Sequence, residues 1–310
     1  MKNISKLLLV VVFAAVLVAI PSLVAKNDLG SRPDVNTTIE KREAIRTMIA
    51  EMRAEIEANN YSYTVGYNPA MQYSLDQLCG AKPELMNPMT APTFTMGEVA
   101  NPEALPAYYI SPYVSAVKNQ GSCGSCWAFG GIAAFESAIM KKDGVEVDLS
   151  EQYIVSCNND GYGCSGGWWA YDIMMSPGVP LESCFPYAAT DLPCDLNCPY
   201  PYQALGSGFA GPEDGVAAVD NIKQAILDYG SVNTCVFVDS VFQAYTGGVM
   251  DRCKRNARWP NHMVSIVGWD DSLGAWKIKN SWGTGWGDNG FIWMTYGCNI
   301  IGYGTTYVIY

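Results

Sequence analysis

The pattern of hydrophobic and polar positions divides the chain into an N-terminal region and, from about Leu105, a helical half followed by a strand-rich half. Between residues 37 and 60, Ile and Met recur at helical spacing among Glu and Arg, which predicts an amphipathic helix. Residues 61–105 are rich in Pro, Met and Asn with little periodicity, so we expect an extended and mostly irregular segment.

After Leu105 the periodicity predicts further elements, and Ser150 is a good N-cap for one of the helices. Helices are predicted at residues 125–140, 150–156, 168–175 and 219–229. Strands are predicted at residues 232–238, 263–269, 276–279, 290–296 and 305–309. The pattern contains no internal repeat.

Length and charge narrow the possible classes of protein. A chain of 310 residues is long enough for one or two domains with a sizeable core. Its formal net charge of -11 disfavours nucleic acid and anionic membranes as partners, because like charges repel. An acidic surface that serves only solubility is the simplest explanation of this charge.

The N-terminus has the composition of an export signal. Lys2 and Lys6 precede an apolar run over residues 7–20, and Ala25 is a candidate cleavage position, which predicts a signal peptide at residues 1–25. The run is short for a membrane span, although an uncleaved anchor remains the alternative. We expect no stable membrane association once the signal is removed. Eleven cysteines fit an oxidising compartment, so we expect secretion or an acidic endolysosomal-type compartment.

The chemistry of the chain depends on one histidine, His262, because the sequence contains no other. Upstream lies a cysteine, Cys126, at the start of a predicted helix, and downstream lies Asn280. A thiol, a base and an amide that orients the base are the minimum set for a thiol nucleophile that attacks acyl groups.

The residues around the thiol resemble a known family signature. They are Cys123-Gly124-Ser125-Cys126-Trp127. They match the papain/cathepsin pattern C-G-[SA]-C-[WY], in which His and Asn follow about 130–150 residues downstream, as His262 and Asn280 do here. The chain therefore resembles a papain-family, cathepsin-like cysteine peptidase. This resemblance implies a two-lobed α+β papain-like fold, with a helical N-terminal lobe, a β-rich C-terminal lobe and the active-site cleft between them.

The resemblance also implies a role for each catalytic residue. Cys126 would be a thiolate paired with a His262 imidazolium, helped by the helix dipole, and would form an acyl-enzyme that water hydrolyses. Asn280 would orient His262, and Trp282 would shield that hydrogen bond from solvent. The Gln120 side chain and the Cys126 backbone N–H would bind the oxyanion. No cofactor and no metal are expected.

Substrate-binding residues are implied in the same way. Gly166 and Gly167 would pair their backbone with an extended polypeptide substrate. The residues expected to flank the main specificity pocket, which would prefer an apolar side chain, are Trp168, Trp169, Met263 and Cys235.

The cysteines are assigned partly by resemblance. It implies the pairs Cys123–Cys164, Cys157–Cys194 and Cys253–Cys298. Cys184 and Cys198 remain close in sequence, and we expect an additional bridge between them. Cys79 and Cys235 are then left as thiols, and a buried strand position is an equally good explanation for Cys235.

The resemblance divides the chain into the signal peptide, a propeptide at residues 26–103 and a peptidase domain at residues 104–310. The propeptide is expected to fold onto the catalytic domain and to inhibit it intramolecularly, with a passive spacer as the alternative. A monomer with endopeptidase activity is expected. Asn261 precedes His262 where the family commonly has Asp, which would alter the pH profile.

Two other classes of function remain. A catalytically silent homologue could use the same fold for binding. The C-x-x-C spacing of Cys123 and Cys126 is also found in thiol–disulfide oxidoreductases, which would pair these two cysteines with each other. A metal site for the clustered cysteines is disfavoured, because there is one histidine and no second C-x₂-C.

Overall fold

The computed structural model describes residues 35–310, apart from residues 89, 93, 196 and 255. The predicted signal peptide lies outside the described residues. The chain separates into two compact units, Met1–Arg42 and Glu43–Tyr310. The described part of the first unit, residues 35–42, forms the first turns of helix α1 (Val35–Asn59), which continues into the second unit. Within the described residues, no helix has the length and apolar character needed to cross a bilayer.

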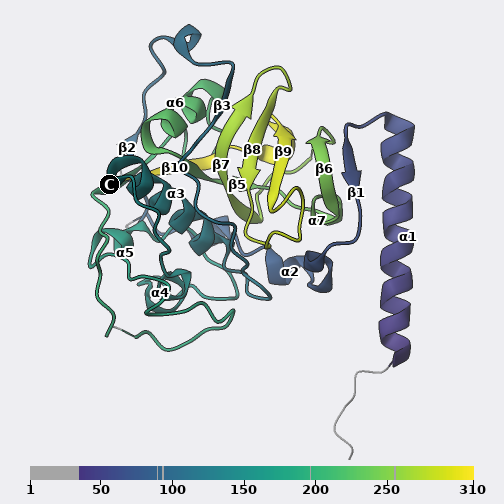
Figure 1. Cartoon of the computed structure of the whole chain (residues 1–310), viewed down its shortest axis with the longest axis horizontal. Helices are drawn as coiled ribbons and strands as arrows, with labels where there is room; N and C mark the ends of the chain where they lie inside the picture. The colour runs from purple at the N-terminus through teal and green to yellow at the C-terminus, as the bar shows by residue number, and fades with distance from the viewer. Residues whose placement is uncertain (1–34, 89, 93, 196, 255) are drawn as a thin grey trace, which may run out of the picture. The chain divides into compact units, whose positions relative to one another are not determined.

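The helical lobe is built around α3 (Cys126–Asp143), which is buried along most of its length because it packs against both α4 and the sheet. It ends at Gly144, whose φ of 70° places it in the left-handed region that favours glycine. Helix α4 (Glu151–Cys157) begins at Ser150, whose side chain accepts a hydrogen bond from the Tyr153 N–H. Both helices confirm the sequence-based prediction (Figure 1).

One predicted helix starts later than expected. Helix α5 spans Tyr171–Met175, and residues 168–170 lie outside it. Trp168 and Trp169 are almost completely buried, with ring centroids 4.8 Å apart. The tryptophans that suggested a helical pattern are therefore core residues on a non-helical stretch, and the prediction was wrong over these residues.

The β-rich lobe centres on a mixed sheet of ten strands within the described residues (Figure 1). The strand order is β1-β6-β9-β8-β7-β5-β10-β4-β2, and β3 pairs separately with β7. The five predicted strands are confirmed as β5 (Val232–Val236), β7 (His262–Asp270), β8 (Ala275–Lys279), β9 (Phe291–Thr295) and β10 (Tyr303–Ile309). The predicted helix α6 (Val219–Tyr229) packs beside them.

The remaining strands were not predicted, because they are short or glycine-rich. They are β1 (Tyr63–Val65), β2 (Phe94–Thr95), β3 (Tyr108–Ile110), β4 (Gly206–Phe209) and β6 (Tyr245–Met250). Two single-turn helices also went unpredicted, α2 (Leu75–Leu78) and α7 (Ser240–Gln243). Short 3₁₀ turns occur at Pro69–Gln72, Pro83–Leu85, Pro102–Ala104 and Cys298–Ile300.

The segment before the peptidase domain is docked on the β-rich lobe. Ile49 and Met52 of α1 are buried in the apolar cluster of that lobe. Strand β1 extends the sheet by pairing with β6, and the Arg252 guanidinium bridges Glu55 of α1 and Asp239 at 2.8 and 3.0 Å. This segment is therefore ordered by contacts that are distant in sequence, which explains why local periodicity did not reveal them.

A buried network of charges joins α3, α4 and the sheet. The Lys118 ammonium contacts Glu136 of α3 at 2.8 Å and Glu151 of α4 at 2.9 Å. Ser115 donates to Glu136 and accepts from Lys279 of β8 at 2.8 Å. Burial raises the pKa of Glu151, although the neighbouring Lys118 ammonium opposes this shift. Buried charges are tolerated only when paired, so the network fixes how these elements meet.

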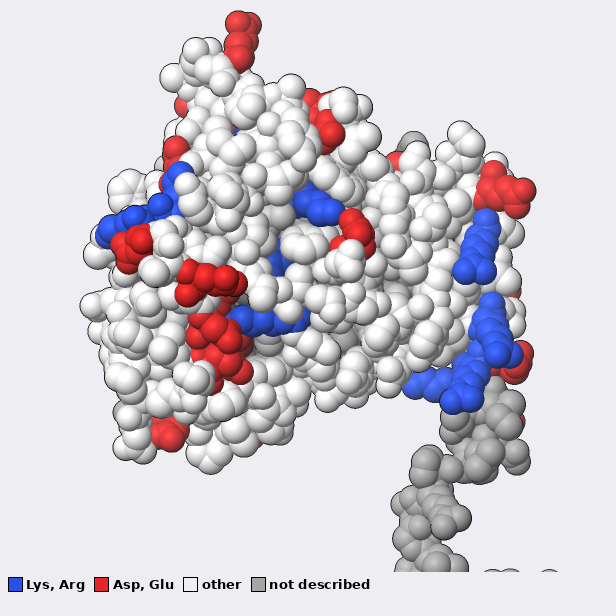
Figure 2. All heavy atoms as spheres, in the orientation of Figure 1, with Lys and Arg blue, Asp and Glu red and all other residues white. Residues whose placement is uncertain are grey.

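On the face shown in Figure 2, acidic and basic groups are scattered among uncharged residues, and several basic groups lie close together at the right-hand edge, over helix α1.

Candidate active site

The predicted thiol nucleophile stands at the N-terminus of a long helix. Cys126 is the first residue of α3, and its side chain is completely buried. The partial positive charge of a helix N-terminus stabilises a thiolate at this position. The Gly80 N–H donates a hydrogen bond to Cys126 Sγ at 3.3 Å.

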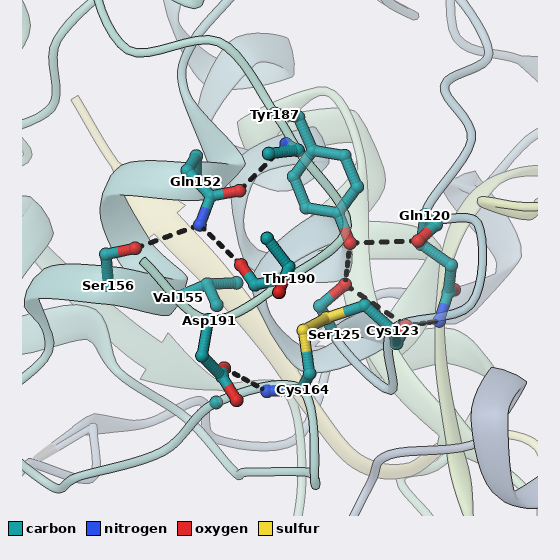
Figure 3. Close-up of a disulfide and its surroundings, with 12 residues drawn as sticks. Gln120, Cys123, Ser125, Gln152, Val155, Ser156, Cys164, Tyr187, Thr190 and Asp191 are labelled. Carbon is teal, nitrogen blue, oxygen red and sulfur yellow. Dashed lines mark hydrogen bonds between the residues drawn. A yellow bond between two sulfur atoms is a disulfide. The ribbon is translucent and has the colours of Figure 1, made fainter. Parts of the chain in front are cut away.

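A disulfide and a tyrosine hold the loop before the nucleophile (Figure 3). Cys123 is bonded to Cys164, and the Gly124 N–H donates to the Cys164 carbonyl at 2.9 Å. The Tyr187 hydroxyl lies 2.6 Å from Ser125 Oγ and donates to the Gln120 carbonyl at 2.9 Å. Because Cys123 is paired with Cys164, it is not paired with Cys126, and the oxidoreductase alternative is contradicted.

The predicted base and the amide predicted to orient it come from neighbouring strands. His262 begins β7, and Asn280 directly follows β8, which pairs antiparallel with β7. His262 Nε2 lies 2.8 Å from Asn280 Oδ1, which also accepts from the Ser281 N–H at 2.8 Å. This arrangement assigns the proton to Nε2 and leaves Nδ1 for the reaction; among the described residues Nδ1 has no hydrogen-bond partner. The Trp282 ring covers the pair, with its centroid 4.9 Å from that of His262.

The Gln120 amide is held by both of its ends. Its oxygen accepts from Ser281 Oγ at 2.7 Å, which fixes the orientation of the side chain. Its Nε2 donates to the carbonyls of Leu78 at 2.9 Å and Cys123 at 2.8 Å. A donor that is already aimed at a carbonyl oxygen beside the nucleophile is what an oxyanion hole requires.

Residues 78–82, which we call the strap, run directly over the nucleophile. Beyond the contacts of Leu78 and Gly80, the Ala81 N–H donates to the Asn261 carbonyl at 3.0 Å. The Lys82 N–H donates to the Gly167 carbonyl at 3.1 Å. The strap therefore touches the residues expected to bind substrate through backbone groups.

The two glycines facing the strap have separate roles. Both backbone groups of Gly167 bond to the strap. Its carbonyl accepts from the Lys82 N–H, and its N–H donates to the Gly80 carbonyl at 2.9 Å. Gly166 has a φ of 121°, and a Cβ at this position would lie 2.8 Å from the Gly80 carbonyl oxygen. A side chain at Gly166 would thus strain the backbone and also push an extended chain out of the cleft.

The strap changes the electrostatics of the catalytic pair. Burial raises the pKa of Cys126 to about 11, although the N–H groups of Met263 and Gly80 oppose the shift. Burial lowers the pKa of His262 to about 4, although Asn280 opposes the shift. Both groups are therefore neutral at pH 7 beneath the strap. The thiolate–imidazolium pair expected of the resting enzyme requires an uncovered cleft.

This neutral state predicts a steep pH dependence of thiol reactivity. Below a pKa of about 11, the thiolate fraction rises about tenfold per pH unit. Alkylation of Cys126 by iodoacetamide in the intact chain should therefore accelerate about 100-fold between pH 7 and 9. Intact-mass time courses would measure it, with Cys126→Ala to subtract labelling of Cys79 and Cys235. A rate that is flat from pH 6 upward would show that the ion pair already exists beneath the strap.

The residues expected around the specificity pocket lie in one apolar cluster with Cys126. Cys235 of β5 stands opposite Met263 of β7, and both are essentially fully buried. Trp169 packs edge-on against Phe209 at 4.9 Å. With the strap in place these side chains are core residues, and their part in substrate binding stays a prediction.

The cysteines outside the site are placed in pairs. Disulfides join Cys157 to Cys194, Cys184 to Cys198 and Cys253 to Cys298. Free thiols within the described chain are Cys79, Cys126 and Cys235. The described residues contain no group of three or more His, Cys, Asp or Glu side chains placed to hold a metal ion.

Sequence reasoning missed several contributors to the site. Gly80 and the other strap residues stand in a stretch without periodicity, and no sequence signal pointed to them. Ser281, whose hydroxyl donates to the Gln120 amide oxygen, was not singled out from the sequence either. Asn261 uses its side chain to bind both backbone groups of Val238, at 2.7 and 2.9 Å, so it fixes the loop before His262.

Comparison with known proteins agrees with this geometry. Residues 108–309 match the family model for papain family cysteine proteases. Digestive cysteine proteinase 1 of Homarus americanus is 31% identical over 256 residues, which cover 79% of each chain. Cathepsin L 2 of Paramecium tetraurelia is 38% identical over 182 residues, 57% of this chain but only 54% of that protein, so the match spans about half of its length.

A solved structure supports the same conclusion. The digestive procathepsin L2 proteinase from the larval midgut of Tenebrio molitor superposes with a TM-score of 0.79 at 25% identity, covering 90% of this chain and 95% of that one. The likeness confirms the predicted two-lobed α+β architecture. On its sequence, its fold and the arrangement of its cleft, this chain belongs to the papain family of cysteine proteases.

Proposed function

We propose that this protein is the precursor of a cysteine endopeptidase, which hydrolyses peptide bonds through a Cys126 acyl-enzyme and is inhibited by its own strap. One observation carries the proposal. The strap places the Leu78 carbonyl on the Gln120 amide and the Gly80 N–H on the Cys126 sulfur. A polypeptide backbone thus already occupies the position that a substrate would need.

The reaction follows from the groups in the cleft once the strap has left. The Cys126 thiolate attacks the carbonyl carbon, and Gln120 Nε2 with the Cys126 N–H stabilises the oxyanion. His262 protonates the departing amine, and Asn280 keeps the imidazole ring in the required plane. Water, deprotonated by His262, then hydrolyses the thioester and restores the thiol.

The division between propeptide and peptidase domain is supported by exposure and pairing. Residues 101–104 are all exposed, so a protease can reach them. Strand β3 follows and pairs with β7 of the catalytic body. Cleavage near residue 103 would therefore release the inhibitory segment with its two edge strands, β1 and β2, and leave strands β3–β10 in place.

The compartment in which the enzyme acts is proposed from its disulfides. Four disulfides fit an exported protein in an extracellular or acidic endolysosomal-type compartment. The procathepsin relatives and the strap support polypeptide substrates and the propeptide as the intramolecular inhibitor. We further propose that the mature enzyme is a monomer that does not stay bound to membranes and has no nucleic-acid partner.

Labelling with a peptidyl epoxide tests this function. Protein matured at mildly acidic pH with a thiol reductant should gain one adduct, on Cys126, as measured by intact mass and peptide mapping. Cys126→Ala, matured in trans, should gain none. Folded and processed protein that gains no adduct would instead indicate a catalytically silent binding homologue.

A further inference from the structure

A second free thiol lies on the strap beside the nucleophile. Cys79 stands between Leu78, whose carbonyl accepts from Gln120, and Gly80, whose N–H donates to Cys126 Sγ. Of the eleven cysteines, eight form disulfides and three are free. One of the free thiols, Cys79, therefore belongs to the residue next to the one that contacts the sulfur of another, Cys126.

Covalent geometry limits how far apart they can be. Gly80 N lies 3.3 Å from Cys126 Sγ, and the bonds leading back to Cys79 Cα are about 1.5 and 1.3 Å long, so this Cα lies within about 6 Å of the sulfur. Disulfides join Cα atoms that are usually about 4.4–6.8 Å apart, and each sulfur lies roughly 3 Å from its own Cα. The two Cα atoms therefore lie within about 9 Å of each other, and rotation of the side chains together with movement of the strap brings the sulfurs into bonding range.

The two thiols differ in access. Cys126 is fully buried beneath the strap, whereas Cys79 is only partly buried. A small reagent in solution therefore reaches Cys79 first. Cys235, the third free thiol, is completely buried within β5 and is held in the sheet by pairing with β7.

We propose that Cys79 and Cys126 form a disulfide that locks the strap onto the nucleophile in oxidising surroundings, and that reduction must precede release of the strap. The proposal rests on the inhibitory role proposed above for the strap. It adds a redox requirement to the removal of the propeptide. The bond also protects the Cys126 sulfur from irreversible oxidation before the enzyme matures.

The oxidant is a low-molecular-weight disulfide of the glutathione class. The Cys79 thiolate attacks one of its sulfurs, which forms a mixed disulfide and releases one thiol. The Cys126 thiolate then attacks Cys79 Sγ, forms the protein disulfide and expels the second thiol. The protein loses two hydrogen atoms, which the two released thiols carry. Burial raises the pKa of both thiols, so the exchange should accelerate as the pH rises.

Mass spectrometry of the intact chain tests the proposal. After incubation with oxidised glutathione at pH 8, the chain should be lighter by two hydrogens, and a non-reducing peptide map should show a Cys79–Cys126 link that dithiothreitol removes. Cys79→Ser and Cys126→Ala should not form this link. Cys235→Ala is the matched control and should form it as the unaltered chain does.

Three results would overturn the proposal: mixed glutathione disulfides alone, a Cys79–Cys235 link, or Cys79 and Cys126 both remaining open to alkylation. The readout is a covalent bond and does not depend on peptidase activity. A chain that forms the link, yet never reacts with the epoxide after reduction and maturation, would support the lock and contradict the proposed function.

Discussion

Replacing His262 with alanine should lower kcat of the matured enzyme by about 10⁴-fold or more, because the chain has no other histidine to act as acid and base. The loss should fall on kcat with little change in KM, since His262 acts on protons rather than on substrate affinity. Steady-state kinetics on a peptide substrate would measure it. The variant has to be processed in trans by a small amount of active enzyme.

Two controls separate catalysis from folding. The melting temperature of His262→Ala should stay close to that of the unaltered chain, because Phe242 and Trp282 continue to fill the surroundings of the ring. Alkylation of Cys126 at mildly acidic pH should slow, because the thiolate loses its imidazolium partner. A variant with more than a hundredth of the original kcat would show that another group transfers the protons.

Replacing Gly80 with alanine should release the strap. A Cβ at this position would lie 1.6 Å from the Gly124 carbonyl oxygen, far inside any real contact. The strap must then move away and lose the hydrogen bonds to Cys126 and Gly167. Overpacking of this kind costs about 1–3 kcal/mol, and this clash lies at the upper end, so epoxide labelling of the intact, unprocessed chain at pH 7 should rise roughly 100-fold.

Gly97, which lies in the predicted propeptide but outside the strap, provides a matched control for this prediction. A Cβ on Gly97 would meet nothing within 4 Å, so Gly97→Ala should label at the rate of the unaltered chain. Intact mass would confirm that the labelled species still carries the propeptide. Equal rates for both variants would mean that the strap does not limit access to Cys126.

Much of the site was predictable, because its residues stand in motifs that are contiguous in sequence. Cys126, His262 and Asn280 were singled out from the residues beside them; the structure pairs His262 with Asn280 and places Cys126 at the start of α3, and their catalytic roles stay a prediction. Their supporting partners were harder to find. The charge of Glu136, for example, is explained only by Lys118 and Ser115, which lie on a different part of the fold.

Elements whose form is decided by distant contacts were missed. Strand β4 consists of Gly-Ser-Gly-Phe and has no alternating pattern, yet it is fixed between β10 and β2. Helix α1 was predicted because its own apolar spacing is regular. The strap is the extreme case: beyond Leu78, the last residue of α2, it has no helix or strand of its own, and its form is set by Gln120, Cys126 and Gly167.

The attachment of the strap to the rest of the chain explains how a few backbone hydrogen bonds can keep the cleft closed to substrate. Helix α1 and strand β1 hold the chain on one side of the strap, and β2 holds it on the other. Such tethering gives an effective concentration on the order of millimolar at the cleft, so even a weak intrinsic affinity keeps the cleft filled. Once the chain is cut and the propeptide diffuses away, rebinding of the strap to the cleft depends on the concentration of free propeptide in solution. This concentration is far lower than the effective concentration in the intact chain. A single cleavage would then be irreversible in practice.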